Sequence, residues 1–270
     1  MPHPLWDPRQ YLRYQEERTR PLGELLARIP ADLAPRRILD MGCGPGNSTA
    51  PLRSRWPDAH ITGIDLSPQM LEPARAAHAG GNPGGTGTTD FAEADARTCD
   101  VAGEHPDLLV SNALLQWVPD HLGLLADWVG ALRPGGVLAF QVPGNFDAPS
   151  HTLLAELRTG PRWHRLLGRG VRRDAAVHDP ADYLRCLADR GCTADVWETT
   201  YYPLLPGPDP VLEWTRGTAL RPVLTLLPDE EDRDAFLAEY RDLLRRAYPA
   251  GPHGTVFPFR RIFAVARRPA

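Results

Sequence analysis

Short apolar runs recur along the first half of the chain and predict a regular series of strands. Bounded by polar or glycine-rich residues, these runs lie at 36–40, 60–65, 91–94, 107–111 and 137–142. Longer amphipathic stretches between them predict helices at 48–56, 67–79 and 122–132. Repeated strand–helix units of this length are typical of an α/β fold, in which a parallel sheet carries helices on both faces.

Two of the predicted helices contain an internal proline. A helical stretch at 9–29 precedes the first strand, and Pro21 predicts a break in it because proline lacks a backbone N–H. In the helix after the second strand, Ser67 is expected to be the N-cap, with Pro68 at the first helical position. Pro73 lies inside that helix and predicts a kink or a split.

The pattern changes after about residue 145. Helical segments at 150–187 and 210–248 now alternate with strands at 193–202 and 262–266. With the earlier strands, this predicts a doubly wound, mostly parallel seven-stranded sheet with helical insertions. We expect one domain over 1–270, made of an N-terminal helical cap (1–30), a ligand-binding core (31–145) and two helical insertions that cap the substrate (146–190 and 206–250).

Length and charge narrow the class of protein. A chain of 270 residues fits one decorated domain, and its net charge of −4 argues against a nucleic-acid partner, which usually needs a basic face. No apolar run is long enough to predict a membrane span, and the N-terminus lacks the apolar core of a secretory signal. We therefore expect a cytoplasmic protein without a nucleic-acid or membrane partner. The oligomeric state is left open.

The basic side chains and the cysteines limit the available chemistry further. All 30 basic side chains other than histidine are arginines, so an anionic ligand has to be held by arginine, histidine or backbone N–H groups. The four cysteines show no spacing typical of a zinc site or a redox motif, so reduced thiols are expected. The arginine-rich stretch 162–173 is interpreted as a solvated helix face or as a surface that steers an anionic substrate.

A glycine-rich turn follows the first predicted strand and is the strongest local signal of a ligand site. The sequence DMGCGPGN at 40–47 opens the next helix, and Asp65 ends the second strand about 20 residues later. Gly42 and Gly44 would let the backbone approach a ligand closely, while the Asp65 carboxylate can accept from two ribose hydroxyls. This arrangement predicts a nucleotide-like ligand.

The acidic residues around this turn distinguish between two classes of ligand. A nicotinamide dinucleotide site usually has the spacing GxGxxG, which this turn does not match. Asp40 precedes the turn and would repel a pyrophosphate, whereas it suits the ammonium and sulfonium of S-adenosylmethionine (SAM). A third acid, Asp95, ends the next strand, where it can accept from an adenine amino group while the N–H of Ala96 faces a ring nitrogen. A surface turn is the alternative for Asp95.

Several stretches carry a resemblance to a known family. The motif order is similar to that of the class I SAM-dependent methyltransferases. More specific stretches resemble the bacterial trans-aconitate 2-methyltransferases: WDP at 6–8, ERTRP at 17–21, GCGPGNST at 42–49, RWP at 55–57, ITGID at 61–65, LQW at 115–117, TTYY at 199–202 and LRP at 220–222. The glycine-rich loop at 79–89 is longer than the resemblance predicts.

The resemblance implies transfer of the SAM methyl group to a carboxylate of trans-aconitate, which gives a monomethyl ester and S-adenosylhomocysteine. A carboxylic acid with a pKa near ~4 is already ionised at neutral pH, so the nucleophile needs no general base. We therefore expect no catalytic acid or base and no metal. His121 is interpreted as a satisfied or exposed histidine, although a hydroxyl or amine acceptor would make it a candidate base.

The expected cofactor site contains residues from the carboxyl ends of the first four strands, together with one tyrosine from the helical stretch that precedes them. Its members are Asp40, Gly42, Gly44, Asp65, Leu66, Asp95, Ala96, Asn112 and Tyr11. Asn112 is expected to contact the methionine end of SAM. Tyr11 could close over the cofactor or belong to the core.

The expected substrate residues are Gln116, Trp117, Tyr202, Arg221 and Arg260. The two arginines lie in stretches that resemble the family, and an arginine fork matches a carboxylate in bidentate fashion. Trp117 could wall the methyl channel or pack in the core. Tyr201 and Tyr202 alternate along a strand, so at most one faces a pocket, and Tyr202 is favoured.

Other functions stay open from the sequence. One is a class I methyltransferase acting on the carboxylate of a malonyl-carrier protein. Another acts on a small-molecule amine, hydroxyl or carbon. A SAM-binding protein without transfer activity would keep the same acidic and glycine residues, because binding alone requires them.

Overall fold

The chain forms two compact units. The computed structural model describes residues 15–80, 84–167, 177–227 and 229–270, so the predicted site residue Tyr11 lies outside the described residues. One unit, called the sheet unit, comprises the described residues 18–80, 84–143, 177–199 and 261–270. The other, called the helical unit, comprises the described residues 15–17, 144–167, 200–227 and 229–260. The sheet unit is therefore built from three segments that are separate in the sequence.

Seven strands of the described residues form one sheet. They are β1 (Arg37–Met41), β2 (His60–Asp65), β3 (Thr89–Glu93), β4 (Leu108–Asn112), β5 (Val137–Pro143), β6 (Thr193–Tyr201) and β9 (Phe259–Arg267). Their order is β3-β2-β1-β4-β5-β9-β6. The first five strands, β1 through β5, pair with their neighbours in parallel. β9 runs antiparallel to β5. The predicted doubly wound, mostly parallel sheet is confirmed.

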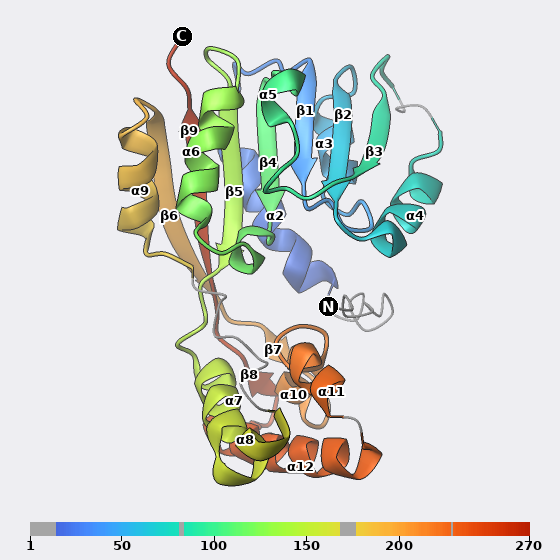
Figure 1. Ribbon diagram of the computed structural model, residues 1–270, viewed down its shortest axis with the longest axis vertical. Helices are drawn as coiled ribbons and strands as arrows, with labels where there is room; N and C mark the ends of the chain where they lie inside the picture. The colour runs from blue at the N-terminus through green and yellow to red at the C-terminus, as the bar shows by residue number, and fades with distance from the viewer. Residues whose placement is uncertain (1–14, 81–83, 168–176, 228) are drawn as a thin grey trace. The chain divides into compact units, whose positions relative to one another are not determined.

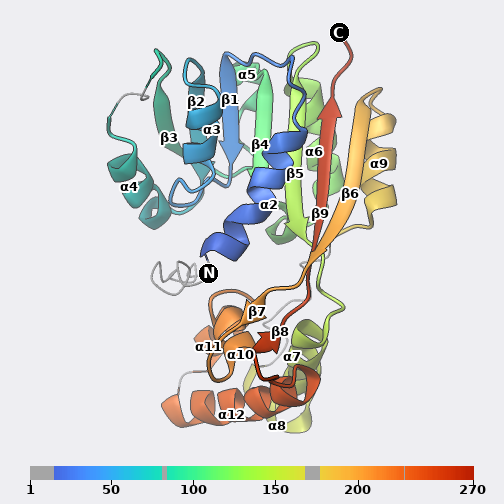
Figure 2. The ribbon, with the colours of Figure 1, turned by 180° about the vertical axis from the view of Figure 1, so that it is seen from behind.

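Helices cover both faces of this sheet. Figure 1 shows α5 (Val101–Glu104) and α6 (His121–Ala131) in front of the strands, and Figure 2 shows α2 (Gln15–Arg28) and α3 (Thr49–Arg55) in front of the opposite face. α4 (Pro68–Ala77) packs beside β3, and α9 (Pro180–Ala188) packs on α6. A short 3₁₀ turn, η1 (Leu115–Trp117), follows β4.

The face that carries α6 holds the main apolar core of the sheet unit. Leu109, Leu138 and Phe140 point from the strands into a cluster that includes Trp128 of α6 and Tyr183 of α9. These side chains are almost fully buried, and burying each one stabilises the fold by roughly 1.5–3 kcal/mol relative to leaving it exposed. The sheet is therefore held in place by packing on this face. The carboxyl ends of β1 to β5, which carry polar residues, lie together at one edge of the sheet.

Prolines inside two helices do not interrupt them. α2 continues through Pro21 and α4 continues through Pro73, so the predicted break at Pro21 and the predicted split at Pro73 are wrong. The alternative of a kink at Pro73 stays a prediction. Tertiary packing outweighs the lost hydrogen bond, since Leu22 lies beside Pro21 and is buried, and Leu71 anchors α4 in the same way. Ser67 precedes α4 as predicted, but its side chain does not cap the helix.

The helical unit has its own core. It contains α7 (Pro149–Thr159), α8 (Pro161–Leu167), α10 (Pro210–Arg216), α11 (Arg221–Leu226), α12 (Glu230–Ala247) and a two-stranded antiparallel sheet of β7 (Leu204–Leu205) and β8 (Thr255–Val256). Trp163, Trp214, Phe236 and Phe257 are buried together in its centre. The Trp163 indole donates to the Glu239 carboxylate at 2.9 Å, so the buried ring also has a polar partner.

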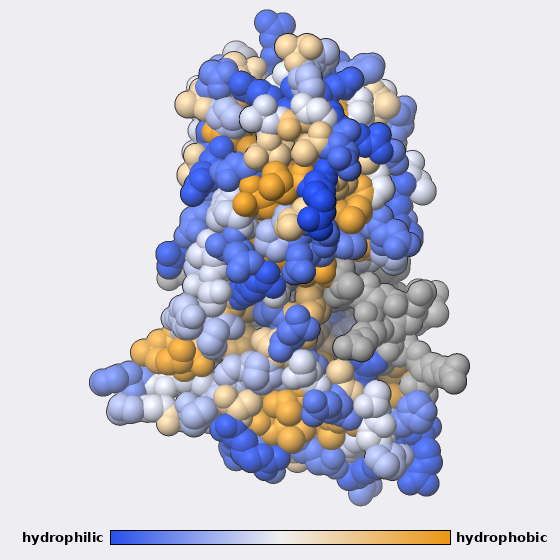
Figure 3. All heavy atoms as spheres, turned by 90° about the vertical axis from the view of Figure 1, so that its left-hand side faces the viewer, coloured by the Kyte–Doolittle hydropathy of each residue, from blue (hydrophilic) through white to orange (hydrophobic). Residues whose placement is uncertain are grey.

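The surface seen from the α9 side is mixed in polarity. Figure 3 shows small groups of apolar side chains set among polar ones on this face. Leu184 of α9, for example, is 44% exposed. Scattered apolar side chains of this kind are normal on a protein surface and require no partner. Within the described ranges, no helix is both long and apolar enough to cross a bilayer.

Candidate active site

The glycine turn after β1 is shaped by three positive backbone angles. Gly42, Gly44 and Gly46 have φ values of 75°, 54° and 87°, in the left-handed region that favours glycine. The N–H of Gly42 donates to the Ile64 carbonyl at 2.7 Å, which ties the turn to β2. An added Cβ at Gly42 would lie 2.8 Å from the Cβ of Leu114, whereas the same position at Gly44 is open. A ligand can therefore approach the backbone at Gly44.

Asp65 joins the glycine turn to the start of α4. One carboxylate oxygen accepts from the N–H of Gly44 at 3.0 Å, and the other accepts from the N–H of Ser67 at 2.9 Å. Each oxygen can accept a further bond, so the carboxylate is still able to bind hydroxyl groups. Leu66 follows it and is 43% exposed, which leaves an apolar surface beside the acceptor.

Asp40 is fully buried beneath the same turn. Its carboxylate accepts from the Ser48 hydroxyl at 2.8 Å and from the Thr49 hydroxyl at 2.6 Å. Burial raises the pKa of Asp40 to about 6, because the charged form is shielded from water. In this structure Asp40 ties the end of β1 to the start of α3. Its carboxylate has no exposed atom with which to make the predicted contact to a cation.

The third acid lies at the end of β3. Arg97 donates to the Asp95 carboxylate, with the Nε atom 2.9 Å from Oδ1, and these hydrogen bonds lower the pKa of Asp95. Asp95 is thus held as an anion. Ala96 follows it and is nearly buried. Any bond from Asp95 to an adenine amino group has to be made alongside the bonds to Arg97.

The loop after β4 presents two further predicted residues. Gln116 is buried in η1 and donates to the Ala113 carbonyl, whereas Trp117 is 50% exposed. Ala113 has a φ of 58°, which is unusual for a residue with a Cβ and fixes the direction of this turn. Trp117 is therefore a surface side chain of the sheet unit, and it does not belong to the core that the sequence offered as its alternative.

The remaining predicted substrate residues belong to the helical unit. Tyr201 is nearly buried, whereas Tyr202 is 68% exposed, so the two tyrosines do alternate. Arg221 begins α11, and Arg260 donates to the Gly144 carbonyl at 3.1 Å. Both arginine side chains are partly exposed.

His121 is held in a closed hydrogen-bond chain. Its Nδ1 lies 3.0 Å from the Val118 carbonyl, which only accepts, so Nδ1 carries the proton and Nε2 accepts from the Tyr183 hydroxyl at 2.8 Å. Burial lowers the pKa of His121 and favours this neutral form. Both ring nitrogens are thus used by the fold, as expected for a structural histidine.

Two residues at the carboxyl edge of the sheet were missed by sequence analysis. Gln141 of β5 and Arg261 of β9 are 1% and 6% exposed, and the Arg261 guanidinium donates to the Gln141 side chain at 2.9 Å. Gln141 in turn donates to Asn112 at the end of β4. The only sequence signal was a polar residue inside each of two strongly apolar strands.

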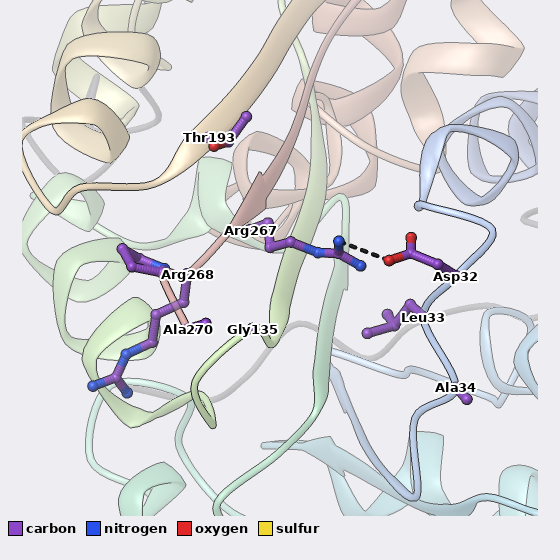
Figure 4. A pocket seen from close by; sticks show the side chains of 9 residues that line it. Asp32, Leu33, Ala34, Gly135, Thr193, Arg267, Arg268 and Ala270 are labelled. Carbon is purple, nitrogen blue, oxygen red and sulfur yellow. Dashed lines mark hydrogen bonds and ion pairs between the residues drawn. The ribbon is translucent and has the colours of Figure 1, made fainter.

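A surface depression of about 490 Å³ lies at the opposite edge of the sheet. Figure 4 shows Arg267 reaching across it to Asp32, with a distance of 2.9 Å between the charged atoms. Arg267 pairs with Val137 at the start of β5, so this is the amino-terminal edge of the parallel strands. Ligands of open α/β sheets bind at the carboxyl edge, and we therefore assign the candidate site to the glycine turn. Among the described residues, no cluster of His, Cys, Asp or Glu is arranged to hold a metal ion.

Comparison with known proteins places the chain in a family. The family model described as "Methyltransferase domain" matches residues 14–195. The trans-aconitate 2-methyltransferase of Streptomyces avermitilis is 58% identical over 99% of this chain and 98% of its own length. The protein of that name from Rhodococcus jostii is 48% identical over 97% of this chain and 99% of its own length.

A solved structure agrees with the fold. Phosphoethanolamine N-methyltransferase 2 of Haemonchus contortus, determined in complex with SAM, matches 93% of this chain and 53% of its own with a TM-score of 0.51 at 16% identity. At that identity the likeness concerns the fold alone. On the full-length relatives and the domain model, the chain belongs to the trans-aconitate 2-methyltransferase family of class I methyltransferases.

Proposed function

We propose that this protein transfers the methyl group of SAM to a carboxylate oxygen of trans-aconitate, giving a monomethyl ester and S-adenosylhomocysteine. The observation that carries the proposal is the 58% identity to a relative of that name over nearly the full length of both chains. The predicted cytoplasmic location accompanies this proposal and stays a prediction.

The residues around the glycine turn fit SAM. The open space at Gly44 admits a ligand to the backbone, and the Asp65 carboxylate beside it suits ribose hydroxyls. Leu66 offers an apolar surface for one face of the adenine ring, and Asp95 with Ala96 would meet its polar edge. We assign the cofactor-binding role to these residues together with Gly42 and Asn112. Asp40 acts by holding the turn.

The chemistry asks little of the protein beyond position. Bound SAM supplies an electrophilic methyl carbon whose bond to sulfur breaks as the bond to the carboxylate oxygen forms. The acid is already ionised at neutral pH, so no side chain has to remove a proton. The task of the site is to orient the reactants and exclude water, and such orientation supplies roughly 7–11 kcal/mol in well-ordered reactions.

The acid has three carboxylates, and the two that do not react need anchors. Arg221 and Arg260 are our candidates because a guanidinium matches a carboxylate in bidentate fashion. Gln116, Trp117 and Tyr202 are the other proposed substrate residues. Trp117 and Tyr202 are at least half exposed, so their side chains are accessible to a ligand.

The test is methyl transfer from labelled SAM to a panel of acceptors. The panel contains trans-aconitate, cis-aconitate, isocitrate, citrate and malonyl-carrier protein. We expect rapid ester formation on trans-aconitate and much slower transfer to the others. Transfer to malonyl-carrier protein alone, or to none of the panel by a protein that binds SAM, would overturn the proposed acceptor.

A further inference from the structure

Three polar side chains form a row across the carboxyl edge of the sheet. Asn112 pairs with Gln141 in the ladder between β4 and β5, so their side chains lie on the same face. Gln141 pairs with Phe263 in the ladder between β5 and β9, and Arg261 is two residues from Phe263 on that face. The strand order thus brings together residues that are far apart in the sequence.

The chemistry of Arg261 sets the direction of every hydrogen bond in this row. A guanidinium only donates, so the Gln141 atom at 2.9 Å from its Nη1 has to be the amide oxygen. The amide nitrogen of Gln141 then faces Asn112 and donates to its oxygen. The orientation of both amides therefore follows from the charge of Arg261 and does not depend on an arbitrary choice between oxygen and nitrogen.

The amide nitrogen of Asn112 is the group of this row that is left to bind a ligand. Its oxygen accepts from Gln141, so its amide nitrogen points elsewhere, and this nitrogen has no hydrogen-bond acceptor among the described residues. Asn112 is partly exposed at the end of β4, whereas Gln141 is 1% exposed. An amide nitrogen donates only, and it therefore matches an anion such as a carboxylate and repels the ammonium of an amino acid.

We propose that Arg261 and Gln141 are positioning residues that hold Asn112 as a donor toward a carboxylate at the carboxyl edge of β4. The carboxylate belongs either to the methionine end of SAM or to the acceptor acid, and the two sources share the same chemistry. The inference rests on the proposed function for its ligands. It assigns a role to two buried residues outside the predicted site. It also defines the orientation of the Asn112 amide, with its oxygen toward Gln141 and its nitrogen toward the ligand.

The first test is the variant Asn112→Asp. Gln141 can still donate to the new carboxylate, so the row is kept, but an anion now faces the ligand in place of a donor. We expect the Kd for SAM, measured by isothermal titration without acceptor, or the KM for trans-aconitate to rise roughly 10- to 100-fold. The parameter that rises identifies the source of the carboxylate. A lower Kd for SAM would show that Asn112 faces the ammonium and would overturn the proposal.

The second test is Gln141→Glu, which leaves Asn112 itself unchanged. The new side chain accepts from Arg261 but cannot donate, so Asn112 has to turn its nitrogen inward and its oxygen toward the ligand. We expect the same parameter to rise as in Asn112→Asp. A purely structural role predicts the opposite, since a stronger pair with Arg261 should leave ligand binding unchanged. Gln69→Glu, on the exposed surface of α4, is the control for added charge.

Thermal unfolding separates positioning from loss of structure. Both variants should keep a Tm within about 2 °C of the wild type, because the row stays hydrogen-bonded. If the wild type fails to methylate trans-aconitate, the proposed function fails by itself, and direct titration of SAM and of the acid still tests the row. Unchanged binding of both ligands in both variants overturns the inference.

Discussion

The Nε2 atom of His121 accepts a hydrogen bond from the Tyr183 hydroxyl at 2.8 Å, inside the core of the sheet unit. The same hydroxyl accepts from the backbone N–H of His178 at 3.2 Å. This contact joins α6 to α9. It also fixes the His121 ring, whose Nδ1 donates to the Val118 carbonyl just after η1. A structural bond between two helices thus supports the turn that carries Gln116 and Trp117.

Removing this hydroxyl should destabilise the protein. In Tyr183→Phe, the Nε2 atom of His121 is left buried without a donor, which costs about 1–3 kcal/mol. Urea unfolding of wild type and variant measures the difference. Tyr202→Phe is the control, since Tyr202 is 68% exposed and should change stability by less than about 0.5 kcal/mol. Equal stability of Tyr183→Phe and wild type would show that the bond contributes nothing.

Substitution at Gly42 should disturb the cofactor site through the backbone. In Gly42→Ala, the new Cβ meets Leu114 at 2.8 Å and the residue is kept at a positive φ. Adding the usual costs of a left-handed residue and of overpacking gives a loss of roughly 2–5 kcal/mol. Chemical denaturation checks this value.

The matched control is Gly123→Ala in α6. Its Cβ would meet open space, and its backbone does not have a positive φ. Alanine is the better helix former by up to about 1 kcal/mol, so this variant should be slightly more stable than wild type. Similar losses in both glycine variants would contradict the steric explanation.

Asp65 should control SAM affinity. In Asp65→Asn, the amide nitrogen has to face the N–H of Gly44 or of Ser67, which places donor against donor, and the charged acceptor for the ribose is lost. We expect the Kd for SAM to rise roughly 10- to 100-fold by isothermal titration. Asp90→Asn removes the same charge from an exposed side chain of β3 and should leave the Kd unchanged.

Much of this site could be predicted from the sequence because it is local. The glycine turn and Asp65 lie close along the chain, next to strands that apolar runs identify. The row of Asn112, Gln141 and Arg261 could not be predicted, because it depends on β9 pairing with β5, and no local pattern states which strands become neighbours. The continuity of α2 through Pro21 was missed for a similar reason, since tertiary burial decided it.

The two candidate arginines should affect the acid and not the cofactor. In Arg221→Ala or Arg260→Ala, loss of a charged hydrogen bond to a carboxylate should raise the KM for trans-aconitate roughly 10- to 100-fold. The Kd for SAM should stay the same. Arg246→Ala, at an exposed position in the last turn of α12, is the control. An unchanged KM in either variant removes that arginine from the proposed site.

Asp40 should make stability depend on pH in a particular direction. Its pKa is raised from 3.8 to about 6 in the folded protein, so between these values the folded protein holds a proton that the unfolded chain has lost. Stability from this group is therefore present below pH 3.8 and is lost as the pH rises through 6.

The measurement is the difference in unfolding free energy between wild type and Asp40→Asn. Other titrating groups are common to both proteins and cancel in the difference. The unfolding free energy of the wild type, relative to that of Asp40→Asn, should fall by roughly 2 kcal/mol between pH 4 and pH 7. A difference that does not change with pH, or that rises, would show that the carboxyl titrates normally.

The place of β9 in the sheet has a consequence for synthesis of the chain. β9 lies between β5 and β6, although residues 202–258 separate it from β6 in the sequence. While the ribosome is still making those residues, β5 is an open edge with unpaired backbone groups, a state in which nascent chains are prone to associate wrongly. Arg261 enters with this strand, so the orientation of the Asn112 amide is fixed only after residues 202–258 have been made.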